Sequence, residues 1–209
     1  VTMKITRRAL KQSGSALEQA VRRDMAGAIG QAMDAAVFNG SGATGEPLGV
    51  IAGASTYGIT ETDVAATADY AAFRAAVSAF MQANAAAGPG AVRAMIRPEL
   101  WDFLDGSIFD TGSGITQWDR LSRQMGAINT TSNGLAAPSG TPEATTALLT
   151  TTTGGVAPFY VGAWGSVDIV RDPFSDASSG GLRLTALATM DVTVARPVQL
   201  RVLTGLELA

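Results

Sequence analysis

The chain has 209 residues, with 15 basic and 18 acidic side chains, and it contains neither cysteine nor histidine. The absence of both residue types excludes disulfide frameworks, thiolate metal sites and catalytic triads with an imidazole or thiolate, while carboxylate pairs, Ser-Lys dyads and oxygen-only metal sites stay open. A net charge of −3 does not favour a protein that binds nucleic acid by neutralising phosphates, and no apolar run is long enough to cross a membrane.

The first two elements expected are a short strand and a long helix. Residues 1–9 alternate partially between apolar and polar, which indicates a strand. A helix of about 24 residues, or roughly 36 Å, is predicted over residues 15–39, because apolar residues recur at every fourth position. Its apolar stripe consists of Leu17, Val21, Met25, Ile29, Met33 and Val37.

Local signals mark the ends of that helix. Ser15 and Glu18 have the S-x-x-E spacing of a capping box, which predicts the start. Asn39 and Gly40 are typical of a C-terminal cap. Gly27 and Gly30 lower the helix propensity, and we expect another element to approach the helix closely at these positions.

A glycine-rich loop follows over residues 40–49. Its first six residues match G-x-G-x-x-G, a motif that binds dinucleotides only after a strand and before a helix. Here the motif follows a helix and runs into Glu46 and Pro47, so a loop that turns the chain is the preferred interpretation and no cofactor is expected.

The remainder of the chain predicts short helices followed by strands. Helical patterns cover residues 69–87, 98–104 and 118–125, and short strands are expected at 91–96 and 127–131. After Pro142 the pattern is rich in Thr, Val and Leu, which favours strands over residues 145–151, 159–170, 182–195 and 198–203. The fold class expected is α+β.

The chain offers weak candidates for chemistry. Asp102, Asp105, Asp110 and Asp119 are loosely grouped, but their spacing matches no EF-hand loop, so solvated loop acids are preferred over a metal site. A carboxylate-based enzyme stays an alternative, and it predicts a deep cleft lined by Asp102, Asp105 or Asp119.

Charged and aromatic side chains are better candidates for contacts between subunits. Arginine pairs balanced by nearby acids more often form ion pairs, within or between subunits, than phosphate sites. The three tryptophans are too scattered for a base-stacking platform, which favours cores or interfaces. The contact candidates are Arg7, Arg8, Glu18, Arg22, Arg23 and Trp118.

Several segments, in order along nearly the whole chain, resemble the major capsid protein family of tailed bacteriophages, which has the Hong Kong 97-type fold. Each segment is weak alone, and their common order makes the resemblance. The segments are residues 5–13 (ITRRALKQS), the long helix, 33–42 (MDAAVFNGSG), 46–50 (EPLGV), 97–101 (RPELW), 126–130 (GAINT), 165–170 (GSVDIV), 194–198 (VARPV) and 203–205 (LTG).

The resemblance implies a long spine helix, a mixed α/β axial domain and a C-terminal antiparallel sheet. It places residues 1–49 together with about 182–209 in the peripheral domain, and about 50–181 in the axial domain. The family's N-terminal arm and most of its extended loop are missing before Val1, so we expect a truncated or processed core.

The resemblance also implies a structural subunit, not an enzyme, of an icosahedral phage or prophage capsid. Such subunits assemble with copies of themselves into pentamers and hexamers around the DNA genome, in the bacterial cytoplasm, and stay in the virion. A scaffolding segment, a maturation protease and a portal are the other expected partners. Sequence-specific nucleic acid binding is not expected.

Two points stay open at this stage. An encapsulin-like nanocompartment shares the fold and the self-assembly, so it is an alternative to a phage capsid. Some relatives also join subunits by a lysine–asparagine bond; Lys4 lies near the expected extended loop, but no partner motif supports that chemistry.

Overall fold

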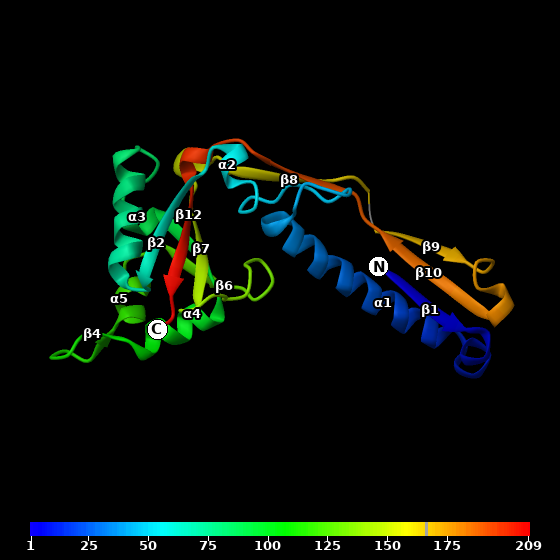
Figure 1. The fold of residues 1–209 in the computed structure, drawn as a ribbon. Coiled ribbons are helices and arrows are strands. Elements are labelled where there is room, and N and C mark those ends of the chain that lie inside the picture. The colour runs from blue at the N-terminus through cyan, green and yellow to red at the C-terminus, as the bar shows by residue number, and fades with distance from the viewer. Residues whose placement is uncertain (166) are drawn as a thin grey trace. The chain divides into compact units, whose positions relative to one another are not determined.

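The computed structural model describes residues 1–165 and 167–209, with the side chains of Leu10, Gly14 and Ser15 outside the description. The chain forms two compact units (Figure 1). Unit 1 consists of Val1–Ala35 and Val161–Asp191, and unit 2 of Ala36–Tyr160 and Val192–Ala209. The boundaries between the units fall inside α1 (Arg7–Asn39), β8 (Phe159–Ala163) and β11 (Met190–Val194). β8 and β11 pair with each other.

Unit 1 consists of a three-stranded antiparallel sheet and one long helix. The sheet has the order β1-β10-β9, so that Lys4 lies opposite Arg183 and Arg183 opposite Asp172. The elements of unit 1 are β1 (Thr2–Thr6), α1, β9 (Asp168–Asp172), the 3-10 turn η3 (Ala177–Ser179) and β10 (Gly181–Leu187). Ser166, part of the 165–170 motif, lies outside the described residues.

The helix α1 begins eight residues earlier than expected. It starts at Arg7, directly after β1, and the Thr6 hydroxyl accepts a hydrogen bond from the Ala9 N–H (3.3 Å). Thr6 therefore occupies the capping position, and the predicted start at Ser15 is wrong: Ser15 lies inside the helix. The capping signal at Ser15 did not determine the start, because α1 follows β1 with no residue between them and Thr6 provides an earlier cap.

The predicted apolar stripe of α1 forms the core of unit 1. Val21, Met25 and Ile29 are buried, and Leu17 and Met33 pack against the same cluster. The sheet contributes Ile5, Leu182, Leu184 and Ala186. The stripe is thus confirmed, whereas the approach expected at Gly27 and Gly30 is wrong within this chain, since a Cβ at either position would meet no atom within 4 Å.

Unit 2 is built on a five-stranded mixed sheet with the order β2-β12-β7-β3-β6. β12 is parallel to β2 and antiparallel to β7, while β3 is antiparallel to β7 and parallel to β6. The strands of this sheet are β2 (Thr60–Thr67), β3 (Val92–Ile96), β6 (Ala127–Thr130), β7 (Ala144–Thr151) and β12 (Leu200–Glu207).

Helices and a small hairpin complete unit 2. The helices are α2 (Ala54–Tyr57), α3 (Tyr70–Gln82), α4 (Pro98–Gly106) and α5 (Gln117–Ser122), with 3-10 turns η1 (Pro89–Ala91), η2 (Thr153–Gly155) and η4 (Pro197–Gln199). The hairpin pairs β4 (Ile108–Asp110) with β5 (Ile115–Thr116). None of the described helices is long and apolar enough to span a lipid bilayer.

The core of unit 2 lies between its sheet and α3, α4 and α5. The Asp69 carboxylate caps α3 by accepting a hydrogen bond from the Ala72 N–H (2.9 Å). Phe73 and Phe80 are fully buried from α3, and Leu100 and Leu104 from α4. Met81, expected on the same stripe, lies at the surface instead.

One buried arginine attaches a loop to this core. The Arg97 guanidinium donates to both carboxylate oxygens of Glu99 (2.8 and 2.9 Å) and to the backbone carbonyls of Ser132 and Leu135 (2.7 and 2.8 Å). These bonds satisfy a cation that would otherwise be buried at high cost. They also raise the pKa of Arg97 and lower the pKa of Glu99.

The glycine-rich loop after α1 is a closed turn. Gly40 packs so tightly that a Cβ would lie 2.2 Å from the Pro47 carbonyl oxygen, and Ser41 forms a bridge with Leu48. The Glu46 carboxylate accepts hydrogen bonds from the Ser41 N–H (3.2 Å) and hydroxyl (2.7 Å). The next helix, α2, has only four residues, which agrees with the interpretation of the motif as a turn.

The α+β class is confirmed, with two differences in detail. β2 and the β4–β5 hairpin were not predicted, and the expected strands 159–170 and 182–195 are each divided into two. The C-terminal strands belong to three different sheets, so that antiparallel pairing is joined by parallel pairing in unit 2. The compact units also divide the chain differently from the expected domains: residues 36–49 and 192–209 belong to unit 2, and residues 161–181 belong to unit 1.

Candidate assembly surfaces

The N-terminal end of α1 carries positive charge that the chain does not neutralise. Arg7 and Arg8 occupy the first turn, their side chains are exposed, and that turn contains no acid. Cations at this end oppose the helix dipole. Among the described residues neither arginine forms an ion pair, so both side chains are available to a second molecule.

The predicted pair of Glu18 and Arg22 is satisfied mostly within unit 1. The Arg22 guanidinium donates to Glu18 (2.8 Å), and Arg171 approaches the same carboxylate at 3.8 Å. The hydrogen bond from Arg22 lowers the pKa of Glu18. Arg23, one residue further along α1, is exposed and forms no ion pair with the described residues. It resembles Arg7 and Arg8 more than it resembles Arg22.

The turn between β9 and η3 displays an aromatic side chain on a rigid base. Asp172 accepts hydrogen bonds from the N–H groups of Phe174 (2.8 Å) and Ser175 (3.1 Å), and the Ser175 hydroxyl donates to the same carboxylate. The buried carboxylate of Asp176 binds Arg183 (2.9 Å) and Lys4 (2.6 Å). These bonds lower the pKa of Asp176. Phe174 itself is 83% exposed.

The tryptophans differ in their exposure. Trp118 is partly buried against the core of unit 2 and contacts Trp101 edge to face, with ring centroids 6.4 Å apart. Trp101 is the more exposed of the two, and Trp164 is exposed as well. Trp118, the candidate predicted from sequence, therefore supports a surface that Trp101 completes.

The acidic residues of the enzyme alternative line neither of two cavities found in the described part of unit 2. Asp102, Asp105 and Asp110 are exposed and Asp119 is half-buried. Two cavities of unit 2, one between α3 and α5 and one beside η4, have no carboxylate among their described lining residues. Nor do the described residues include a group of three or more side chains that could hold a metal ion. The geometry gives no support to carboxylate chemistry.

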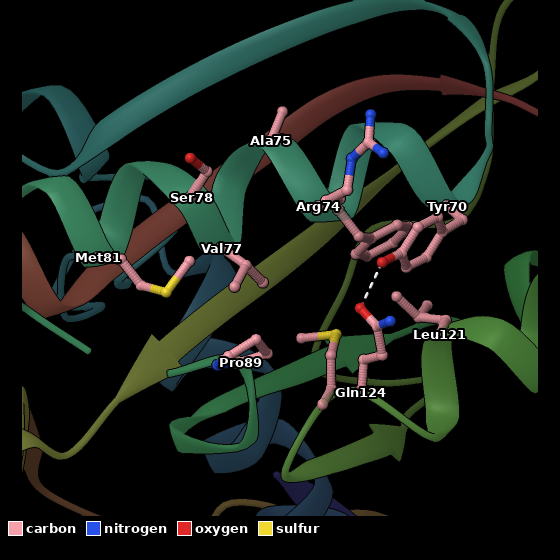
Figure 2. Close-up of a pocket in the computed structure, with 11 residues that line it drawn as sticks. Tyr70, Arg74, Ala75, Val77, Ser78, Met81, Pro89, Leu121 and Gln124 are labelled. Carbon is pink, nitrogen blue, oxygen red and sulfur yellow. Dashed lines mark hydrogen bonds between the residues drawn. The ribbon is translucent and has the colours of Figure 1, made fainter. Parts of the chain in front are cut away.

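The larger cavity lies between α3 and α5 and has a volume of about 440 Å³ (Figure 2). Its apolar wall includes Phe73, Val77, Leu121 and Met125. At one end the Tyr70 hydroxyl donates to the side-chain oxygen of Gln124. The guanidinium groups of Arg74 and Arg120 lie 5.9 and 5.6 Å from the centre of the Tyr70 ring, so this end of the cavity is positive.

Sequence reasoning missed the most exposed apolar side chains. Besides Phe174, these include Trp164, Ile108, Val198 and Tyr160. The available signal was weak: an aromatic residue between Pro173 and Ser175, inside a segment of turn residues, has no core position to fill.

The sequence model of the Phage capsid family matches residues 1–205. The chain belongs to this family. The resemblance found in its motifs is thereby confirmed, and the protein is a structural subunit of a capsid. No curated protein matches the chain with significance.

Solved capsid structures share the fold of this family member. The chain is similar to the capsid of a native GTA particle, with 17% identity, a TM-score of 0.70, and coverage of 98% of this chain and 70% of the other. The capsid of Myoviridae phage XM1 is 14% identical with a TM-score of 0.63, and the match covers 98% of this chain and 71% of the other. The holo-SrpI encapsulin complex from Synechococcus elongatus PCC 7942 is 9% identical with a TM-score of 0.65, and the match covers 100% of this chain and 73% of the other. At these identities the similarity shows a common fold.

Proposed function

We propose that this phage capsid protein assembles with copies of itself into pentamers and hexamers, which build a closed icosahedral shell around a DNA genome. The observation that carries the proposal is the rigid display of Phe174. The bonds of Asp172 and Asp176 fix the backbone that carries this exposed aromatic side chain, so little backbone entropy is lost on binding, which favours an interface anchor.

The charge pattern supports contacts spread over several edges. Arg7, Arg8 and Arg23 are exposed on α1 and find no ion-pair partner among the described residues, so we assign them to contacts between subunits. Glu18 and Arg22 contribute by holding α1 and β9 in place, and Trp118 by supporting Trp101.

Each unit corresponds to one domain of the proposed shell subunit. Unit 1, with the long helix and the three-stranded sheet, is proposed as the peripheral domain. Unit 2, with the five-stranded sheet, is proposed as the axial domain near the centre of a capsomer. The C-terminal strand β12 is an interior strand of that sheet, paired with β2 and β7, which supports its assignment to the axial domain and not to the peripheral one.

Assembly is proposed to occur in the bacterial cytoplasm with a scaffolding segment, a maturation protease and a portal. No catalytic step, metal or cofactor is assigned to the chain. A lysine crosslink through Lys4 is not proposed: no partner motif supports it, and the ammonium group binds the Asp176 carboxylate at 2.6 Å within its own unit.

A nanocompartment shell is the second candidate, favoured by the structural similarity to the SrpI encapsulin complex. Both candidates predict closed particles, and they differ in what the particles contain. DNA inside the particles indicates a phage capsid, and a protein cargo indicates a nanocompartment.

The test is sizing chromatography with negative-stain electron microscopy of the full gene product, including any coding sequence upstream of Val1 and a neighbouring protease. We expect closed icosahedral particles. The variant Phe174→Ala should lower the particle yield, whereas Val170→Ala, at an exposed apolar position of β9, should not. A product that stays monomeric or dimeric under all assembly conditions contradicts the proposal.

A further inference from the structure

The β4–β5 hairpin of unit 2 projects an apolar side chain that its own chain does not cover. All three residues of β4 are exposed, with Ile108 at 59% and Phe109 at 42%. A two-stranded hairpin is marginally stable in water, and neighbouring apolar side chains on its surface add a cost. The hairpin thus has the features of a surface that becomes covered by another molecule.

The hairpin is held in place by contacts of Phe109 and by hydrogen bonds within its turn, while Ile108, which pairs with Thr116 at the base, lies at the surface. The Phe109 ring contacts the Tyr70 ring at 90°, with centroids 5.8 Å apart, and the Arg120 guanidinium lies 5.2 Å from the centre of the Phe109 ring. Phe109 is therefore an internal anchor, and Ile108 is the side chain left to contact another molecule.

The same unit contains a cavity that this hairpin does not fill. Neither Ile108 nor Phe109 is among the residues that line the 440 Å³ cavity between α3 and α5. Met81, at its rim, is 38% exposed, and in Figure 2 the side chains of Val77 and Met81 face Pro89 across the opening. The volume lies within the range that accommodates a small ligand or a few apolar side chains.

The charges of the two features are complementary. Residues 98–119, which form α4, the hairpin and the start of α5, contain five acidic and no basic side chains. Of these acids, Glu99 is neutralised by Arg97. The cavity side carries Arg74 on α3 and Arg120 and Arg123 on and after α5, and no acid lies on α3 or in residues 120–142.

We propose that the hairpin of one copy inserts Ile108 into the α3–α5 cavity of a second copy, with Asp105 and Asp110 facing Arg74 and Arg123. The inference rests on the proposed self-assembly and assigns one of its contacts. Hairpin and cavity are different surfaces of the same unit, so the contact is heterologous and repeats from copy to copy. Such a contact closes a ring or continues indefinitely, and it does not stop at a symmetric dimer.

Disulfide trapping tests this contact, and the chain is suited to it because it contains no cysteine. The variants Ile108→Cys and Met81→Cys are prepared separately, mixed under assembly conditions and oxidised. Cysteine is a small apolar side chain, so it preserves the character of both positions. We expect a disulfide-linked dimer in the mixture and not in either variant alone. The double variant I108C/M81C should give a ladder of linked oligomers.

A matched control uses Asn133→Cys, an exposed position outside the cavity, in place of Met81→Cys. Linkage to position 133 as strong as to position 81 overturns the proposal. So does a linked dimer of Ile108→Cys alone, which would show a symmetric contact between hairpins. Particles that assemble without the specific linkage overturn the inference and leave the proposed function standing. Failure to form any particle contradicts both.

A charge exchange gives a second measurement that needs no cysteine. Asp110→Lys should lower the rate of assembly about tenfold, because it places like charges together at the contact. Adding Arg74→Asp to the same chain should restore most of that loss. If the double variant assembles no faster than Asp110→Lys, the two side chains do not face each other. A small apolar molecule retained in the purified protein and seated in the cavity would also overturn the proposal.

Discussion

The two units of this capsid protein are stabilised in different ways. The core of unit 2 buries aromatic and aliphatic side chains from three helices against a five-stranded sheet. Unit 1 has a smaller core, formed by one face of α1 and one face of a three-stranded sheet. Among the described residues most ion pairs lie in unit 1, around Glu18 and Asp176. Apolar burial therefore dominates the stability of unit 2, and ion pairs support unit 1.

The net charges of the units differ in sign. Unit 1 contains eight basic and seven acidic side chains, and unit 2 contains seven and eleven. Net charge alone therefore favours contacts between unlike units of neighbouring subunits at low ionic strength, whereas the proposed hairpin contact between two copies of unit 2 depends on the local charges of its two surfaces. The comparison thus predicts which perturbations affect folding and which affect assembly.

The largest expected effect is a cavity in the core of unit 2. Phe73 is fully buried, so Phe73→Ala should lower the free energy of unfolding by about 3–5 kcal/mol. Urea denaturation followed by circular dichroism measures the change. Phe109→Ala removes the same ring from an exposed strand, and its cost should be clearly smaller; an equal cost would contradict the description of the core.

The buried arginine of unit 2 should have the next largest effect. Arg97→Ala leaves the carbonyls of Ser132 and Leu135 without their donors and should cost about 2–4 kcal/mol. Amide hydrogen exchange should show faster exchange in residues 131–135. Arg97→Lys keeps the positive charge but lacks the planar guanidinium with its several N–H donors, so it should recover only part of the lost stability. Full recovery by lysine would mean that charge alone matters.

Acid should weaken unit 1 through Asp176. Its pKa is lowered below the ordinary 3.8 by Arg183 and Lys4, so the stabilisation is complete above about pH 4 and is lost as the pH falls through the lower, folded-state value. Asp176→Asn should reduce stability at neutral pH and flatten the dependence below pH 4. Thermal unfolding of both proteins between pH 2.5 and 7 measures this, and an unchanged acid dependence in the variant would contradict it.

The smallest expected effect separates folding from assembly. Arg8→Glu replaces an unfavourable charge in the first turn of α1 with a favourable one, so it should raise the stability by about 0.3–1 kcal/mol. The same change should lower the particle yield if Arg8 contacts another subunit. Arg23→Glu, in the middle of α1, is the control: it should lower the yield without the gain in stability.

The elements predicted correctly from sequence are those with strong local patterns. The stripe of α1, the capped helix α3 and the proline-initiated helix α4 were all found, because their periodicity or caps are encoded within a few residues. β2 was missed, since its sequence TETDVAAT is polar and it becomes a strand only by pairing along β12. The start of α1 was missed for a related reason: β1 and β10 determine where the chain enters the helix.

The sequence shows which residue types are candidates for contacts between subunits, but not which of these side chains are exposed and unpaired. An arginine pair is visible in a sequence, but whether its charge is neutralised depends on residues far along the chain, as Arg171 shows for Glu18. Exposure is harder still, because the Phe174 turn depends on Lys4, which lies far away in the sequence. The cavity between α3 and α5 combines residues from three separate segments and has no sequence signature.

The interior place of β12 in its sheet has a consequence for synthesis. β12 lies between β2 and β7, so neither neighbour has its full set of partners until residues 200–207 have left the ribosome. Such long-range pairing folds slowly compared with local structure. A nascent chain therefore exposes an unfinished sheet until β12 has been made, and unit 2 cannot complete its fold before that point.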